Sequence, residues 1–520
     1  MIGTSVTSCV IWKKDVMQNS DSLKSIVIVG GGSAGWMTAA ALSSLLNPDD
    51  VDITLVESEA IGTIGVAEAT IPDIINFNQI LGISEDEFMK ATNATFKLGI
   101  EFKNWGRKGD SYFHPFGSHG ADMQGIDFHQ FWLYSRKSGN PAAYEDYSIC
   151  STAAKNHKFF FPSQDPRSVL SKLGYAYHFD ATLYAKFLRN YAEKRGVKRI
   201  EGKVETITQN PDTGHIETLT LESKKIINGE LFFDCTGFRS LLLSKTLGVK
   251  FTDWSHWLPC NSAQAIACEA QGPLLPYTKA TAKKAGWQWR IPTQQRTGNG
   301  HIYSSEFISD QEAGDELLAS LDSAAIGSPK QLRFKTGRQQ KFWEKNCISI
   351  GLSGGFLEPL ESTSIYLIQM GISRFISLYP DASISPIVRD EYNNQMSLLF
   401  DHVRDFIILH YCATEREDTS FWAYCKNMSL PDSLVHKIEL FKESGRIFRY
   451  EDELFTKPSW SAVLIGQNIF PRVTDPIVTS LPQEQVQKSL MSMQSGIKSA
   501  IDKMPTHAQF INKYCQTNIT

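Results

Sequence analysis

Two tryptophans stand two residues apart in the segment Gly286–Pro292, within the pattern Trp-x-Trp-x-Ile-Pro. In a strand, residues two apart point to the same face, so Trp287 and Trp289 would together form a bulky and rigid wall. In an arbitrary protein, such a pair more often fills the core. The spacing alone therefore leaves two interpretations open, a wall beside a reaction site and a packed interior.

Charged residues at two places could carry acid–base chemistry. Lys97 lies in the strand-like run Phe96–Ile100, whose apolar residues alternate, so its side chain points away from the apolar face. By itself this pattern favours a solvated lysine. Glu358 and Glu361 lie three residues apart among apolar neighbours, which predicts that at least one is buried. A buried carboxylate could act as a base, and the alternative is a pair of surface acids or helix caps.

Glycines in the segment 30–35 fit the pattern GxGxxG. Gly30 permits a tight turn, Gly32 lets the backbone approach a pyrophosphate, and Gly35 lets helix and strand pack closely. The N–H groups at the start of the following helix would bind phosphate oxygens. Glu57 follows 22 residues after Gly35, where an acid can bind a ribose hydroxyl. The predicted cofactor-binding residues are Gly30, Gly32, Ser33, Ala34, Gly35 and Glu57.

The elements around this turn must hold it in place. Ile26–Val29 is a β-branched run typical of a buried parallel strand, Trp36–Leu42 is typical of a helix, and Val51–Val56 predicts a second strand. This βαβ context favours a dinucleotide site over a glycine turn that binds nothing. Two later strands, Leu231–Asp234 and Cys347–Gly351, resemble the flavin-contacting strands of FAD-dependent monooxygenases and favour FAD over NAD.

Farther along the chain the pattern becomes helical. Tyr184–Arg195 predicts an amphipathic helix, Lys198–Thr208 predicts a strand, and the segments from Ile365 onward are mostly helical. The sequence predicts an α/β fold, with an FAD-binding Rossmann-like domain of the glutathione-reductase or hydroxylase type, β-sheet insertions and a mostly helical C-terminal substrate region. The expected parts are a polar lead-in (residues 1–24), the FAD-binding domain with interleaved substrate-side insertions (25–364) and the helical region (365–520).

Bulk composition excludes several classes of function. A net charge of −4 and an ordinary hydrophobic content of 42% argue against a nucleic-acid-binding protein. The nine cysteines are scattered singly without a CxxC pair, which indicates reduced thiols and no structural zinc. No segment is predicted to span a membrane, and the lysines of the lead-in follow its apolar stretch, the wrong order for a secretory signal. We therefore expect a cytoplasmic protein without a bound metal.

A resemblance to a known family extends from about Ser25 to the neighbourhood of Pro471. It is carried by the segments Gly30–Met37, Gly65–Pro72, Phe96–Trp105, Gly286–Pro292 and Phe356–Ile368. Together they resemble the flavin-dependent tryptophan halogenase family, for which the Trp-x-Trp-x-Ile-Pro pattern beside a flavin fingerprint is highly diagnostic. The resemblance implies an enzyme that uses reduced FAD, oxygen and chloride or bromide to halogenate an electron-rich aromatic ring through hypohalous acid.

Roles for individual residues follow from the resemblance. Lys97 matches the active-site lysine of the family, which would receive hypohalous acid either by a hydrogen bond or as an N-halo amine. Glu361 matches the catalytic glutamate, which would stabilise the cationic ring intermediate and accept its proton. Trp287 and Trp289 would separate the flavin from the substrate and so prevent direct hydroxylation.

The halide site is expected at Thr363 and Ser364, which match the halide-binding backbone of the family at the start of a helix. Ser364 replaces a glycine that is usual in the family, which would crowd the halide or alter which halide is preferred. Ala67 replaces another usual glycine, in the strap segment over the flavin. Further FAD contacts are expected from Leu352, Ile365 and Val204, the last of these at the end of a strand.

An aromatic pocket is expected where His114 and Phe116 would contact the substrate ring together with Trp460. Free-tryptophan halogenases grip the amino acid through paired tyrosines and an acid in the segment that corresponds to Arg449–Trp460. Here this segment is shortened and lacks the paired tyrosines. We therefore expect an indole derivative or another electron-rich aromatic substrate, with free L-tryptophan as the alternative.

Partners and rival functions follow from the same chemistry. The chain contains no second GxGxxG for NAD(P)H, so FADH2 would come from a separate NAD(P)H-dependent flavin reductase, with O2 as co-substrate. One rival is a flavin monooxygenase that hydroxylates an aromatic substrate, which the tryptophan wall opposes. Another is a non-catalytic FAD-binding protein, which Lys97 and Glu361 oppose. Whether the chain forms a homodimer is left open.

Overall fold

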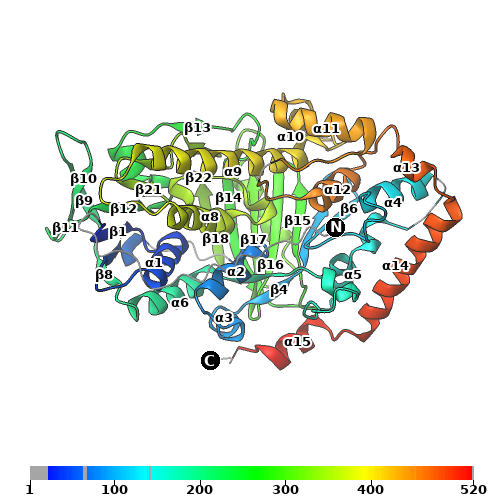
Figure 1. Ribbon diagram of the computed structural model, residues 1–520, viewed down its shortest axis with the longest axis horizontal. Coiled ribbons are helices and arrows are strands. Elements are labelled where there is room, and N and C mark those ends of the chain that lie inside the picture. Colours follow the sequence, from blue (N-terminus) through cyan, green and yellow to red (C-terminus); the bar gives the residue numbers. More distant parts are fainter. Residues whose placement is uncertain (1–21, 62–66, 138, 140–141, 451, 518–520) are drawn as a thin grey trace.

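The computed structural model describes residues 22–61, 67–137, 139, 142–450 and 452–517 (Figure 1). Most of the predicted lead-in lies outside these residues, as do Gly65 and Val66 of the strap segment and Glu451. The architecture is mixed α/β with a parallel sheet and a helical C-terminal part, as the sequence predicts. The domain boundaries at residues 24 and 364 stay predictions.

A six-stranded sheet contains the predicted βαβ unit. All neighbouring strands are parallel except the edge pair β20 and β21. In spatial order the strands are β20 (Trp343–Glu344), β21 (Cys347–Ser349), β12 (Leu231–Asp234), β1 (Ser25–Val29), β2 (Asp52–Glu57) and β8 (Lys198–Glu201). Ile26 and Ile28 pack in the main core on one face, and Val27 and Val29 pack in a second apolar cluster on the other. Burial on both faces explains why this strand is uniformly apolar.

A small antiparallel sheet covers the second face. It consists of β11 (Ile226–Asn228), β10 (Ile216–Leu221) and β9 (Val204–Gln209). The prediction of one strand over Lys198–Thr208 is wrong, because Gly202 has a φ of +153° and a side chain there would meet Leu221 at 2.8 Å. The chain turns at this glycine, so Val204 begins a strand instead of ending one.

A seven-stranded sheet occupies the centre of the molecule, between the cofactor sheet and the long helix α14 (Gln483–Lys503) (Figure 1). Its order is β18 (Ala325–Arg333), β14 (Ser262–Glu269), β17 (Arg296–Tyr303), β16 (Gly286–Pro292), β15 (Thr278–Lys283), β5 (Gly99–Lys103) and β6 (Ser111–Pro115). Only the β15–β5 pair is parallel. The two predicted tryptophans therefore lie on an interior strand of this sheet.

Two three-stranded sheets complete the β structure. One contains β13 (Phe251–Asp253), β19 (Gly337–Gln339) and β22 (Gly355–Phe356), and the other contains β3 (Ala67–Ala69), β7 (Ala176–Asp180) and β4 (Thr95–Lys97). The predicted strand through Phe96–Ile100 is thus two strands, with Leu98 between β4 and β5. Gly99 has a φ of +157°, and a side chain there would meet the His114 carbonyl oxygen at 2.3 Å. Lys97 is consequently the last residue of β4, just before the chain enters β5 of the seven-stranded sheet.

Helices cover the sheets and form the C-terminal part. Helix α1 packs on α6 and α8, and α8 also packs on α2 and on the long helix α9. The helices are α1 (Ser33–Leu45), α2 (Asp73–Ile80), α3 (Glu85–Ala91), α4 (Phe128–Lys137), α5 (Ile149–Lys155), α6 (Ala181–Glu193), α7 (Asp310–Ala319), α8 (Ser364–Ser377), α9 (Pro386–Cys412), α10 (Ser420–Asn427), α11 (Asp432–Ser444), α12 (Lys457–Gly466), α13 (Pro476–Thr479), α14 (Gln483–Lys503) and α15 (His507–Tyr514). Within the described parts of the chain, no helix combines the length and the apolar composition that a membrane span requires.

Candidate active site

A large cavity opens at the carboxyl end of the parallel sheet, where β1 leads into α1. Its volume is about 1230 Å³, ample for a ligand of dinucleotide size. Among the predicted cofactor residues, those that line it are Gly30, Gly32, Ser33, Ala34, Glu57, Val204, Leu352 and Ile365. Gly35 does not line the cavity but packs against Gly30, where a side chain would meet the carbonyl oxygen at 1.8 Å. Predicted cofactor residues that are far apart in the sequence therefore line the same cavity.

The glycine turn fits a dinucleotide pyrophosphate. A side-chain carbon added at Gly32 would meet nothing within 4 Å, so the backbone faces open space there. The N-terminus of α1 follows directly and has no side-chain cap, which leaves its N–H groups available to an anion. Glu57 ends β2 at the same cavity, and Arg199 holds its Oε1 at 2.5 Å. These features suit the phosphates and the ribose of FAD.

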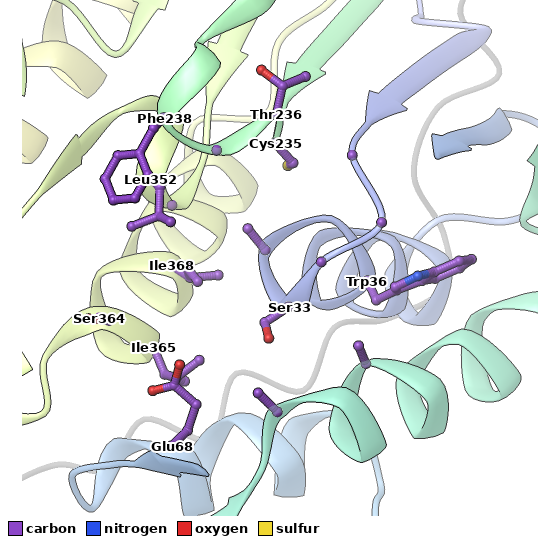
Figure 2. A pocket seen from close by; sticks show the side chains of 18 of the residues that line it. Ser33, Trp36, Glu68, Cys235, Thr236, Phe238, Leu352, Ser364, Ile365 and Ile368 are labelled. Atoms are coloured by element: carbon purple, nitrogen blue, oxygen red, sulfur yellow. The ribbon is translucent and has the colours of Figure 1, made fainter. Parts of the chain in front are cut away.

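Glu68 is a cavity residue that the sequence analysis missed. It lies on strand β3, and its carboxyl group points toward Ile365 and Ser364 (Figure 2). Burial raises the pKa of this carboxyl group from 4.5 to about 7. An acid of this kind lies in the part of the cavity where Leu352 and Ile365 provide apolar surface. Its only signal in the sequence is its place within the strap segment next to Ala67.

The two predicted wall tryptophans have different surroundings. Trp289 lines the cofactor cavity, whereas Trp287 does not and is only 1% exposed. Their ring centres lie 6.1 Å apart. The ring of Trp289 covers Gly300 on the neighbouring strand, where an added side-chain carbon would lie 1.9 Å from Cζ2. Trp289 thus lines the cavity and Trp287 fills the core behind it, and the role of the pair as a wall stays a prediction.

Lys97 is completely buried, which excludes the solvated lysine that its local pattern taken alone favours. Its Nζ donates hydrogen bonds to the carbonyl oxygen of Thr70 at 2.9 Å and to Oγ of Ser362 at 2.8 Å. It also lies 4.9 Å from the ring centre of Phe116. Burial lowers the pKa of Lys97 from 10.5 to about 7, against the opposing charge of Glu361. The amine and the ammonium are therefore both accessible near neutral pH.

The turn that carries Glu361 contacts both Lys97 and the cofactor cavity through Ser362. A 3₁₀ turn, η7 (Pro359–Glu361), ends at Ser362, which has a left-handed φ of 60°. Thr363 then caps α8 without a side-chain hydrogen bond, and Ser364 begins that helix. Ser362 and Ser364 line the cofactor cavity, and Thr363 is buried. The helix N-terminus at the predicted halide residues therefore faces the cofactor side.

Glu361 is 1% exposed and lies between two histidines. Nδ1 of His114 donates a hydrogen bond to Oε2 at 2.8 Å, and Nε2 of His410 lies 2.7 Å from Oε1. Burial raises the pKa of Glu361, but His114 and then His410 more than offset this and hold it at about 2. Sequence reasoning missed His410, because nothing in the helical pattern of α9 distinguishes it from a core residue.

The other predicted substrate residues belong to an aromatic cluster beside Glu361. His114 lies 5.7 Å from Phe406, which stacks on Phe455 at 3.7 Å and meets Trp460 edge-on at 5.1 Å. The indole N–H of Trp460 is buried and has no hydrogen-bond partner among the described residues. Phe406 and Phe455 were missed by the sequence analysis, since apolar aromatic residues carry no distinguishing signal outside their spatial context.

The described part of the segment from Arg449 to Trp460 contains an acid that already has a partner. Glu453 is buried and forms an ion pair with Lys437 of α11 at 2.8 Å. The same lysine lies 4.7 Å from the ring centre of Tyr450 and 4.8 Å from that of Trp460. Glu453 and Tyr450 are therefore both occupied by contacts within the protein.

Comparison with known proteins agrees with this geometry. The family model described as tryptophan halogenase matches residues 25–483. A tryptophan 6-halogenase from Streptomyces toxytricini is 34% identical over 95% of this chain and 98% of its own length. Among solved structures, a flavin-dependent halogenase from Xanthomonas campestris is 43% identical, with a TM-score of 0.93 and coverage of 96% of this chain and 100% of that chain.

A second solved structure, a flavin-dependent halogenase from Brevundimonas sp. BAL3, is 42% identical with a TM-score of 0.92. The similarity covers 95% of this chain and 99% of that chain. The match to the family model and the similarity to these proteins extend over nearly the whole described chain and include both the cofactor cavity and the Lys97–Glu361 site. This chain therefore belongs to the tryptophan halogenase family and is a flavin-dependent halogenase.

Proposed function

We propose that this enzyme halogenates an indole-type or other electron-rich aromatic ring, with Lys97 and Glu361 as its catalytic residues. The observation that carries the proposal is the buried turn from Glu361 to Ser362, which bears one catalytic residue and binds the other. Ser362 also lines the cofactor cavity, so this turn joins the two sites. An oxidant made on the cofactor side could reach Lys97 without meeting bulk water.

The cofactor residues suit FAD in the orientation that the βαβ unit dictates. The glycine turn and the start of α1 would hold the pyrophosphate, Glu57 the ribose, and Leu352 and Ile365 the flavin rings. When bound in its reduced form, FAD supplies the two electrons that convert O2 and a halide into hypohalous acid. Since the sequence has a single GxGxxG, we infer that a separate NAD(P)H-dependent reductase supplies FADH2.

The backbone at Thr363 and Ser364 would bind the halide. Their N–H groups stand at the N-terminus of α8, where unpaired donors and the helix dipole favour an anion. The hydroxyl-bearing side chain of Ser364 lines the cavity at this point, where the usual residue of the family has no side chain. We infer that Ser364 narrows the halide site and so biases the choice between chloride and bromide.

Lys97 would receive the hypohalous acid. Two of its N–H groups are occupied by Thr70 and Ser362. In the ammonium form a third N–H remains to donate to the oxygen of hypohalous acid, and in the amine form the lone pair remains to accept the halogen. A pKa of about 7 makes both forms available at neutral pH.

Glu361 would act on the ring. A carbon–halogen bond forms while the halogen–oxygen bond breaks, and the oxygen takes a proton from the Lys97 ammonium and leaves as water. The ring carbon then loses its proton to Glu361, whose negative charge stabilises the cationic ring before this transfer. Return of that proton from Glu361 to the Lys97 amine restores the starting state, and the pKa values of about 2 and about 7 favour that direction.

The contacts around the aromatic cluster support a substrate without the charged groups of a free amino acid. The carboxylate of Glu453 is neutralised by Lys437, so it offers little attraction to an ammonium group. Phe406, Phe455 and Trp460 provide apolar surface, and the unpartnered indole N–H of Trp460 offers one donor. Indole or an uncharged indole derivative fits this set of groups.

The test is a reaction with FAD, an NADH-driven flavin reductase and bromide, offered indole and tryptophan side by side and analysed by mass spectrometry. We expect brominated indole in excess of brominated tryptophan, and no brominated product from Lys97→Met. Efficient bromination of tryptophan would contradict the substrate assignment. A hydroxylated product in place of a brominated one would contradict the reaction itself.

A further inference from the structure

Trp287 lies behind Trp289, and its indole has one hydrogen-bond partner among the residues that the structure describes. Its indole Nε1 donates a hydrogen bond to Oε2 of Glu358 at 2.9 Å. Strand pairing holds the backbone of Trp287 between β15 and β17, but the backbone does not determine the rotation of the ring. The hydrogen bond to Glu358 therefore selects one orientation of this indole beside Trp289.

Glu358 is unusual for a residue with so many apolar neighbours. It is 0% exposed, and no cation among the described residues forms an ion pair with it. Oε2 accepts hydrogen bonds from Trp287 and, at 2.5 Å, from the hydroxyl group of Tyr411, whereas Oε1 has no hydrogen-bond partner in the described chain. A buried acid with one unsatisfied oxygen lowers stability, so a structural role alone does not explain it.

The same two segments make two parallel contacts. Glu358 and Glu361 lie at the two ends of one turn, and His410 and Tyr411 are neighbours at the end of α9. Tyr411 binds Glu358, and His410 contacts Glu361. Both ends of this turn thus contact the same end of α9, Glu358 through Tyr411 and Glu361 through His410.

We propose that Glu358 is a positioning residue that holds Trp287, and through it the Trp289 wall, in the orientation that separates the cofactor cavity from the Lys97 site. Tyr411 fixes Glu358 in turn. This inference rests on the proposed function, because a separating wall has a purpose only if an oxidant passes between two sites. Glu358 does not line the cofactor cavity, although its neighbours Leu357 and Pro359 do.

Replacement of Glu358 tests this role, because the wall should affect what share of the electrons from NADH leads to halogenated product. The measurement is the ratio of halogenated product to NADH consumed, taken at equal concentrations of folded, FAD-binding enzyme. Glu358→Leu removes the acceptor, and we expect this ratio to fall on the order of ten-fold, the change that loss of one hydrogen bond to a charged group produces. Glu358→Gln keeps one acceptor oxygen for both donors, and we expect it to retain the ratio within about three-fold.

Trp287→Phe keeps an aromatic ring but removes the N–H donor. We expect it to lower the ratio as Glu358→Leu does, and we expect the double variant to be no worse than either single one. Trp343→Phe is the matched control, because Trp343 is equally buried and donates its N–H to the Lys345 carbonyl oxygen at the edge of the cofactor sheet. It should lower the melting temperature without changing the ratio. Additive effects in the double variant, or a change in the control, would overturn the proposal.

A second measurement is independent of halogenation. In a protein labelled with ¹⁵N at the tryptophan indoles, Trp287→Phe identifies the Trp287 N–H resonance. This resonance should titrate with Glu358, whose pKa burial raises to about 7, and should stay constant in Glu358→Gln. The other titratable groups that face Glu358 are Tyr411, Cys260 and Cys425, and burial raises the pKa of each well above its ordinary value.

The two measurements separate failure of this inference from failure of the proposed function. If the wild-type enzyme forms no halogenated product but the Trp287 resonance follows Glu358, the proposed function fails and the hold of Glu358 on Trp287 stands. If halogenation occurs but the Trp287 resonance is the same in wild type, Glu358→Gln and Glu358→Leu, Glu358 does not position Trp287 and the inference is overturned.

Discussion

Nε2 of His410, a fully buried residue near the end of α9, lies 2.7 Å from Oε1 of Glu361. The other ring nitrogen of His410 accepts a hydrogen bond from the hydroxyl group of Tyr112 at 2.8 Å, and Tyr112 accepts one from Gln467 at 3.3 Å. The ring also stacks on Phe102 with centres 4.5 Å apart. This chain of contacts holds the His410 ring beside the carboxylate, and His114 together with His410 keeps Glu361 ionised.

Removal of this contact should change how the enzyme responds to acid. In His410→Phe the pKa of Glu361 should rise from about 2 toward 4.5, so the acid limb of the halogenation rate should move to higher pH. With a pKa of 4.5, half of the carboxyl groups would be protonated at pH 4.5, so we expect the rate there to fall about two-fold relative to its value at neutral pH. The pH dependence of kcat/KM for bromination measures this effect.

Stability gives a second readout of the same contact. A lowered pKa in the folded state stabilises the protein above the unfolded value of 4.5, and this contribution is lost as pH falls toward 2. His410→Phe should therefore melt at a lower temperature at pH 6 and lose less on acidification than the wild type. As a control, Tyr392→Phe removes a buried hydroxyl group that donates to the Gly371 carbonyl oxygen, and it should leave the pH profile unchanged.

Lys97→Met should abolish halogenation and preserve cofactor binding. Methionine has a similar length and suits a fully buried position, but it cannot donate to hypohalous acid or carry halogen. We expect a loss of at least about 100-fold in turnover, as for other groups that transfer protons in the rate-limiting step. Flavin absorbance titration should give an unchanged affinity for FAD, because Lys97 does not line the cofactor cavity. Weaker FAD binding would indicate a structural role instead.

Anion binding in the cofactor cavity should weaken above neutral pH because of Glu68. Its pKa of about 7 means that the carboxyl group becomes negatively charged as pH rises through that value. The charge develops beside Ser364, at the predicted halide site (Figure 2). The bromide concentration for half-maximal rate should therefore increase between pH 6 and pH 8, and Glu68→Gln should remove this dependence. An identical pH dependence in Glu68→Gln would exclude this role.

Gly300→Ala should displace the ring of Trp289. An added side-chain carbon would lie 1.9 Å from Cζ2 of Trp289, and both residues are on paired strands that cannot separate cheaply. We expect weaker FAD binding and a smaller share of NADH converted to halogenated product. Gly496→Ala on α14 is the control, because its nearest neighbour there would be 3.5 Å away. Trp289→Phe in the Gly300→Ala background should partly restore FAD binding, since the smaller ring vacates the contested space.

Local sequence was sufficient for the cofactor half of this protein. The cofactor turn is built from consecutive parts of the chain: the strand Ser25–Val29, the glycine turn and the strand that ends at Glu57. The spacing of these residues in the sequence was therefore enough to predict how they are arranged. The same holds for the helices of the C-terminal part, whose apolar periodicity is a property of consecutive residues. The mixed α/β fold and the flavin-dependent halogenase family could accordingly be predicted before any coordinates.

Tertiary structure alone decided the chemistry of the second site. Lys97 is buried because strands from two sheets and the turn at Ser362 enclose it, although its local pattern is that of a solvated lysine. Glu361 is an anion because His114 and His410, from a distant strand and a distant helix, point at it. Burial and charge pairing depend on residues hundreds of positions apart, so no local pattern reports them, whereas a turn or a helix is determined by its neighbours in sequence.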